Sequence, residues 1–280
     1  MNDRPKIPRF LGLAAKPAGP WRAVLIAIPF VLCLGLYIAA SQARHAENPR
    51  DKILPTFTQM GEAVNRMAFQ EDARTGKYLM LADTVSSLRR LLLGIVLAAV
   101  LGLVIGIHMG LFPGIEALSS AFVTVVSIIP PLAILPILFI TFGVDEVAKV
   151  VLIFIGTFPL ICRDTYLYTK NIPREQITKA LTLGAGPFRT TYSVIMPQVI
   201  PRLLDTTRLS FGAGWLFLIA SEAIASTDGL GYRIFLVRRY LAMDIIIPYV
   251  FLITLLGYLI DLALKKTVSW KYSWYREQNG

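Results

Sequence analysis

The sequence predicts an all-α membrane protein with six transmembrane helices. Hydrophobic residues make up 55% of its 280 residues, and charged residues make up only 16%. Soluble proteins contain about 25% charged residues, so the composition excludes an ordinary cytosolic enzyme, a disordered chain and a disulfide scaffold. The net charge of +10 comes from basic residues that cluster beside apolar runs. This arrangement favours membrane lipid as a partner and argues against nucleic acid.

The apolar runs define the expected organisation of the chain. A helix of roughly 20 residues crosses the hydrocarbon core of a bilayer, and apolar runs of about this length cover residues 21–40, 88–111, 115–142, 147–162, 199–223 and 245–264. They predict an N-terminal tail (1–20), a first transmembrane helix (21–40), a polar periplasmic segment (41–78), a membrane core (79–265) and a C-terminal tail (266–280). An even number of spans places both termini on one side, and Lys and Arg slightly favour the cytoplasm for that side.

The basic tail and the first run could alternatively form a signal peptide cleaved near Ala40. The apolar region of a signal peptide usually has 7–15 residues, and the run here is longer. We therefore expect a retained anchor helix.

Small residues recur at every fourth position of the second run, at Gly94, Ala98, Gly102, Gly106 and Gly110. Residues four apart share one helix face, and small side chains on that face allow close backbone contact within a membrane. The pattern predicts a helix packed inside a bundle. Glycine is also simply frequent in membrane helices, which is the alternative explanation.

The third run contains Pro130, Pro131 and Pro136. Proline lacks a backbone donor and kinks a helix, and in a membrane the freed carbonyls need neighbours or a wet cavity. We expect a broken helix that faces a translocation path, with a purely structural kink as the alternative.

Residues 163–198, between the fourth and fifth runs, predict two short helices with an apolar face. Pro173 and Glu175 suit a helix start, and Ile177, Ala180, Leu181 and Gly184 form one stripe at helical spacing. Gly184 suits the end of this helix, and Pro187 can begin a second one. Such a face usually docks onto a partner, although packing against the protein's own spans would also cover it.

The same segment resembles the cytoplasmic signature of binding-protein-dependent ABC importer permeases, which reads E-A-A, three residues, G, nine residues and I-x-L-P. Gly184, Val194, Met196 and Pro197 occupy the last four signature positions at the family's spacing. The E-A-A positions are Thr178, Lys179 and Ala180, so only the final alanine matches. Residues 86–110, 127–143 and 206–232 also resemble the nitrate, sulfonate, taurine and bicarbonate branch of this family.

The resemblance implies the type I ABC importer (MetI-like) permease fold in a bacterial inner membrane, with both termini and the 163–198 coupling loop in the cytoplasm. It implies a second permease copy, with a homodimer expected, two cytoplasmic ABC ATPase subunits and a periplasmic solute-binding protein. It places contacts to the ATPase at Glu175, Thr178, Lys179, Ala180, Leu181, Gly184, Pro187 and Pro197. Gly76-Lys77 lacks the remainder of a Walker A motif, so ATP and Mg²⁺ should bind the partner ATPases and no cofactor should bind this chain.

Two ionisable residues in the fifth run need an explanation, because a charge at mid-bilayer costs roughly 2.5–3.5 kcal/mol on insertion scales. Arg208 could contact an anionic solute or form an internal ion pair with Asp205, Asp261 or Asp164. The resemblance suggests a gate or a contact with the binding protein at Glu222, although a cap at the helix end would also explain this residue. With two histidines and no Cys/His spacing, the sequence predicts no metal site.

The function that follows is a transport subunit working by alternating access, which forms the path for a small solute such as nitrate, bicarbonate, a sulfonate or taurine. A self-sufficient secondary transporter would show inverted repeats or a relay of buried acids, and a membrane-embedded enzyme would need catalytic groups clustered at one depth. Neither pattern stands out in the sequence. The chain is therefore expected not to be an enzyme.

Overall fold

The computed structural model describes residues 19–49, 51–73 and 75–275, and this part of the chain is helical without any strand. Most of the predicted N-terminal tail and residues 276–280 of the predicted C-terminal tail lie outside the described residues. The long helices are α1 (Gly19–Glu47), α3 (Leu79–Leu111), α4 (Pro113–Ile128), α6 (Glu146–Lys170), α9 (Met196–Ile224) and α11 (Met243–Lys271). The short ones are α2 (Phe57–Val64), η1 (Asn65–Phe69), η2 (Pro131–Ile134), α5 (Leu135–Phe142), α7 (Arg174–Thr182), α8 (Pro187–Arg189), η3 (Thr190–Ile195) and α10 (Leu230–Arg238).

Several of these helices have the length and composition of membrane spans. Among the described residues, α1, α3 and α11 are long and apolar enough to cross a bilayer, and the bent α4–α5 pair would make a fourth span. Helices α6 and α9, with 25 and 29 residues, occupy the places of the two other predicted spans. The all-helical membrane fold is confirmed, and the number of six spans stays a prediction.

Close packing of α3 against α6 forms the centre of the bundle. A Cβ atom added to Gly94, Gly106 or Gly110 would lie within 2.7 Å of a side-chain carbon of Ile153, Thr165 or Thr169, all on α6. Ala98 is fully buried on the same face. The small residues therefore form a packing face, as their spacing predicts, because only residues without bulky side chains let the two backbones come this close.

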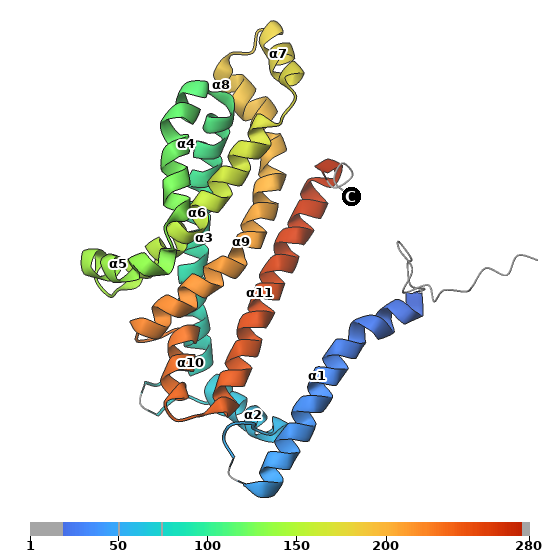
Figure 1. Cartoon of the computed structure of the whole chain (residues 1–280), viewed down its shortest axis with the longest axis vertical. Coiled ribbons are helices and arrows are strands. Elements are labelled where there is room, and N and C mark those ends of the chain that lie inside the picture. Colours follow the sequence, from blue (N-terminus) through green and yellow to red (C-terminus); the bar gives the residue numbers. More distant parts are fainter. Residues whose placement is uncertain (1–18, 50, 74, 276–280) are drawn as a thin grey trace, which may run out of the picture.

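The predicted break in the third run occurs at its first two prolines. Helix α4 ends at Ile128, and the chain resumes as η2 from Pro131 and as α5 from Leu135. The two halves meet at 84°, so α5 turns away from the bundle axis (Figure 1). The ring of each proline blocks the hydrogen bond that a continuous helix would need at that position.

Helix α1 stands apart from the bundle and is attached at one end (Figure 1). The Tyr37 hydroxyl donates to the carbonyl of Pro55 at 2.6 Å, and the Ser41 hydroxyl donates to the carbonyl of Leu54 at 2.9 Å. Arg44 pairs with Asp51 at 2.8 Å. The apolar part of α1 is otherwise exposed, with 0% of its most hydrophobic window buried.

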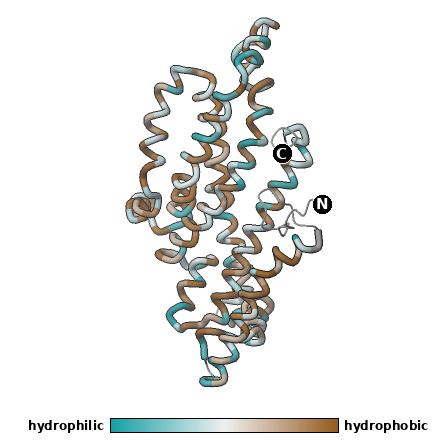
Figure 2. The backbone as a smooth tube through the Cα atoms, turned by 45° about the vertical axis from the view of Figure 1, so that its right-hand side comes forward, coloured by the Kyte–Doolittle hydropathy of each residue, from teal (hydrophilic) through white to brown (hydrophobic). Residues whose placement is uncertain are grey.

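The ends of the long helices and the turns between them carry much of the polar sequence (Figure 2). In Figure 2 the hydrophobic colour dominates the long helices, and hydrophilic stretches are frequent where the chain turns. The start of α1 and the end of α11 both point towards the end of the molecule that carries α7, whereas α2 and α10 lie at the other end (Figure 1).

Candidate functional site

The coupling loop forms two short helices joined by a sharp turn. Pro173 caps the start of α7, and Gly184 follows its end with a φ of +83°, a left-handed conformation that suits glycine. Pro187 then starts α8, which continues through the π-helical turn η3 into α9. The two helices and their boundaries agree with the pattern of prolines and glycines in the sequence.

The outer face of this loop is exposed. None of the residues of α7 is buried, and the side chains of Leu181, Leu183 and Phe188 are 48%, 88% and 76% exposed. Ile177 turns inward, where it packs on a cluster of Ile172, Ile195 and Val199, and Ala180 is half-buried. The predicted stripe is therefore divided, because Ile177 anchors it to the bundle while Leu181 and Gly184 stay exposed.

The residues proposed to contact the ATPase lie on this projecting part of the loop or directly after it. Ala180 is half-buried, and the others are exposed, namely Glu175, Thr178, Lys179, Leu181, Gly184, Pro187 and Pro197. The Thr178 hydroxyl donates to the carbonyl of Arg174 at 3.1 Å. Glu175 lies in the first turn of α7, where its negative charge interacts favourably with the positive end of the helix dipole.

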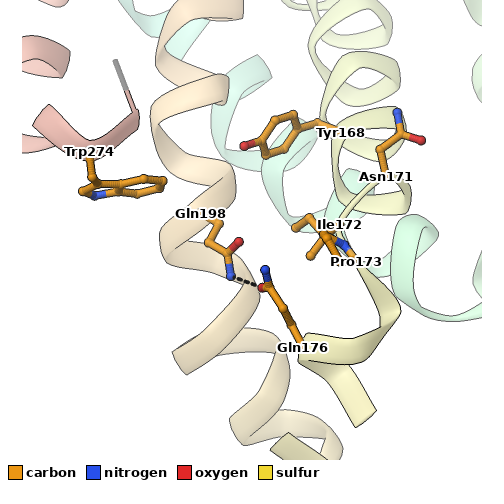
Figure 3. Close-up of a pocket in the computed structure, with 7 residues that line it drawn as sticks. All are labelled: Tyr168, Asn171, Ile172, Pro173, Gln176, Gln198 and Trp274. Atoms are coloured by element: carbon orange, nitrogen blue, oxygen red, sulfur yellow. Dashed lines mark hydrogen bonds between the residues drawn. The ribbon is translucent and has the colours of Figure 1, made fainter. Parts of the chain in front are cut away.

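A pocket lies between the start of the coupling loop, the start of α9 and Trp274 (Figure 3). Its volume is about 590 Å³, and Tyr168, Asn171, Ile172, Pro173, Gln176, Gln198 and Trp274 line it. The Gln198 side-chain amide donates to the Gln176 carbonyl oxygen at 2.9 Å across this space (Figure 3). The loop is thus joined to α9 by one amide pair and by the small apolar cluster around Ile177.

An aromatic group links the second half of the loop to α3. His108 stacks on Phe112 at a ring distance of 5.8 Å and contacts Tyr192 at 6.0 Å. Tyr192 in turn packs on Phe188 at 4.6 Å. These rings therefore form a continuous contact from α8 through η3 to the end of α3, which was not predicted from the sequence.

The three prolines of the predicted path lie at the bend between α4 and α5. Pro130 and Pro136 are exposed and Pro131 is half-buried. Their neighbours Ile128, Ile137 and Ile140 are 73%, 60% and 87% exposed. The bend therefore presents an apolar surface that no described residue covers.

Arg208 lies between α9 and α11 beside two carboxylates. Its Nη2 atom is 3.8 Å from Asp205, and its Nε atom is 3.5 Å from Asp261. Asp164, the third partner considered, instead accepts two hydrogen bonds from Arg202 at 2.6 and 2.8 Å.

Glu222 is fully buried in a charge network centred on Arg90. Arg90 donates to Glu222 at 2.7 Å, to Glu146 at 2.5 and 2.7 Å, and to Asp228 at 2.5 Å. Glu222 also accepts from the Ser87 hydroxyl at 2.8 Å. The network joins α3, α6, α9 and the turn before α10.

Asp228 belongs to that turn and carries a shifted pKa. Partial burial acts to raise the pKa of this carboxyl, but hydrogen bonds from Ser86 and Arg90 outweigh it and hold the pKa below its ordinary value. Asp228 therefore stays ionised and keeps its pairing with Arg90 at neutral pH.

A second ionic cluster lies beside the first and secures α10. Arg233 and the Tyr249 hydroxyl donate to Asp83 at 2.8 and 3.0 Å, and the Gly229 amide donates to it at 3.0 Å. Sequence reasoning identified Glu222 but missed Arg90, Asp83 and Arg233. Their position within or next to an apolar run was the signal in the sequence that could have identified these three charges.

No three His, Cys, Asp or Glu side chains in the described ranges form a metal-binding group.

The chain matches the binding-protein-dependent transport system inner membrane component family over residues 94–266, which is more than half of its length. It belongs to that family of transport permeases. It is thus a multi-pass membrane transport subunit, and the family expected from its coupling loop is confirmed.

Curated relatives indicate the branch of the family. The chain is 31% identical over 192 residues to the taurine transport system permease protein TauC of Escherichia coli (strain K12), covering 69% of this chain and 70% of the relative. It is 33% identical over 135 residues to the putative aliphatic sulfonates transport permease protein SsuC of the same strain, covering 48% and 51%. It is 28% identical over 180 residues to the bicarbonate transport system permease protein CmpB of Synechocystis sp. (strain PCC 6803), covering 64% of each. These relatives agree with the predicted branch.

Solved structures show the fold. A chain of the inward-facing MetNI methionine ABC transporter superimposes with a TM-score of 0.59 and 21% identity, covering 68% of this chain and 94% of that chain. The predicted type I, MetI-like permease fold is confirmed.

Proposed function

We propose that this chain is the membrane-spanning subunit of an ATP-driven importer for a small solute with an oxyanion or sulfonate group. Its transport relatives are named for taurine, aliphatic sulfonates and bicarbonate, which supports this solute class. In the proposed cycle, ATP and Mg²⁺ bind two partner ATPase subunits, and their closure opens the permease pair towards the periplasm, where a binding protein delivers the solute. ATP hydrolysis then resets the pair to its inward-facing state.

The observation that carries this proposal is the projecting, uncovered apolar face of the coupling loop. Leu181, Leu183 and Phe188 are exposed around the turn between α7 and α8, and an apolar surface of this kind usually marks a docking site. The loop lies at the end of the molecule towards which the start of α1 and the end of α11 point (Figure 1). We assign this end to the cytoplasm and the end with α2 and α10 to the periplasm.

The test is co-purification of the ATPase with a permease that carries Leu181→Ser, Leu183→Ser and Phe188→Ser together. Burying a large apolar side chain contributes about 1.5–3 kcal/mol, so we expect ATPase affinity to fall at least about tenfold. Membrane insertion and thermal unfolding should not change, because these side chains are exposed.

The control carries Ile53→Ser and Phe69→Ser, which alter exposed apolar residues in the segments around α2, at the other end of the molecule. It should retain the ATPase. Full ATPase recovery with the triple variant would mean that the coupling loop is not the docking site. Flux through the chain reconstituted alone would favour a secondary transporter instead.

A further inference from the structure

Charged side chains meet halfway along the seam between α9 and α11. Arg208 lies near the middle of the 29-residue helix α9, and Asp261 faces it from α11 at 3.5 Å. Asp205 lies 3.8 Å from the same guanidinium. Ionisable groups at mid-membrane depth are costly and generally belong to a functional site.

Arg208 is held only loosely by these carboxylates. Charge-assisted N–H···O bonds are about 2.7–2.9 Å long, and both of its ion-pair distances are longer. Its Nε atom is buried without a hydrogen-bond partner among the described residues. Arg202, on the same helix, instead binds Asp164 at 2.6 and 2.8 Å. The Arg208 guanidinium therefore has N–H donors available for a ligand, whereas the Arg202 guanidinium uses its donors to bind Asp164.

A second donor without a partner lies on the same face of α9. Trp215 is about two helical turns beyond Arg208 and is 7% exposed. Its indole N–H has no hydrogen-bond partner in the described ranges. Its Nε1 atom lies 3.5 Å from the position of a Cβ added to Gly257 of α11. Two donors without partners thus lie about 10 Å apart along one seam, and each suits an oxygen acceptor.

The seam also has room and access. Between Arg208 and Trp215 lies Gly212, which is exposed, and a Cβ added there would meet no heavy atom of the described residues within 4 Å. The Asp261 side chain is 48% exposed. The Arg208 side chain is 21% exposed, so part of its guanidinium is open to a small solute together with the Asp261 carboxylate, while its Nε atom is buried.

The balance of charge selects the kind of solute. Asp205 and Asp261 together outweigh Arg208 by one negative charge, so a simple inorganic anion would meet net repulsion. A solute with both an oxyanion and an ammonium group would pair with Arg208 and with a carboxylate. We infer that the α9–α11 seam is a binding site for a small zwitterionic solute, an inference that rests on the proposed function and narrows its substrate class.

The test measures equilibrium binding of radiolabelled taurine, the probe that carries both charges, to the permease–ATPase complex in nanodiscs without binding protein. We expect saturable binding at millimolar concentration. Ethanesulfonate and ethylammonium, each lacking one charge, should compete at least about tenfold more weakly. Arg208→Gln should abolish taurine binding. Asp261→Asn should weaken taurine binding but leave competition by ethanesulfonate unchanged or stronger. The control Lys271→Gln, an exposed change at the last residue of α11, should have no effect.

Three results would overturn the inference: no taurine binding by the wild type, equal binding of ethanesulfonate or nitrate, or unchanged taurine binding by Arg208→Gln. The competition series on the wild type decides the question even if a variant fails to fold. ATPase recovery in the same samples tests the proposed function separately. A complex that retains its ATPase but binds no taurine would contradict only the zwitterion site, and a chain that recovers no ATPase can still be tested alone for taurine.

Discussion

The Arg90 guanidinium is shielded from solvent, with 1% of its side chain exposed, and contacts three carboxylates. Glu222 is completely buried with it, whereas Glu146 and Asp228 reach solvent with 53% and 44% of their side chains exposed. A buried charge is tolerated when it is paired and hydrogen-bonded. Arg90 therefore fixes the turn between α9 and α10 onto α3 and α6.

Replacing Arg90 should destabilise the protein strongly. Arg90→Gln removes the positive charge and leaves Glu222 buried without its cation, a change that typically costs about 3–5 kcal/mol. The measurement is thermal unfolding of the purified protein in detergent. Arg239→Gln, an exposed change in the turn after α10, is the control and should leave the transition unchanged. Equal stability of the two variants would show that the network does not support the fold.

The partners of Arg90 explain why this site was not predicted. Glu146, Asp228 and Glu222 are 56, 138 and 132 residues away along the chain. The spacing of residues along the chain does not predict which of several charged side chains will form an ion pair. Arg208 shows the same limit in part. Asp205 lies three residues away on α9 and follows from helix spacing, whereas only the packing of α9 against α11 brings Asp261 to Arg208.

At the scale of elements, the α3–α6 contact depends on glycines. A Cβ on Gly106 would lie 2.8 Å from the carbonyl oxygen of Cys162, a backbone atom that cannot rotate away. This contact joins the two helices that carry Arg90 and Glu146, so it positions the charge network as well as the core.

Gly106→Ala should therefore destabilise the bundle although alanine is the better helix former. Overpacking of this kind costs about 1–3 kcal/mol, against a helix-propensity gain of about 1 kcal/mol. Gly35→Ala is a matched control within α1, where the added Cβ meets no described heavy atom within 4 Å, and it should be neutral or slightly stabilising. Thermal unfolding of both variants measures whether the change in stability has opposite signs. A stabilised Gly106→Ala variant would refute the close contact.

The turn after α7 offers a similar comparison. Gly184 has a φ of +83°, whereas Gly186 has an ordinary φ of −70°, and an added Cβ meets no described heavy atom within 4 Å at either position. Left-handed backbone at a non-glycine residue costs of the order of 1–3 kcal/mol. Gly184→Ala should therefore speed amide hydrogen exchange in α7, and Gly186→Ala should not. Equal exchange in the two variants would contradict the turn geometry.

The whole molecule consists of a packed bundle and an outlying helix, and its two cysteines report on this division. Cys33 on α1 is exposed, and Cys162 on α6 is buried. A thiol in the core reacts only when the structure opens. N-ethylmaleimide should therefore modify one thiol per native chain in detergent, none in Cys33→Ser, and both in denaturing detergent. Rapid modification of Cys162 in the native protein would mean that α6 is not central.

Sequence reasoning was enough to predict the all-helical membrane fold, the break at Pro130 and Pro131, the small-residue face of α3 and the two short helices of the coupling loop. Each of these follows from local rules, since helix periodicity, proline geometry and glycine conformations act within a few residues of the chain. Three features could be seen only once the helices were packed together, namely the charge network of Arg90, the division of the coupling stripe between Ile177 and an exposed face, and the pairing of Arg208 with Asp261. Those features arise where helices that are distant in sequence pack together. The interaction energies that favour one partner over another depend on burial and distance, and neither can be derived from the spacing of residues along the chain.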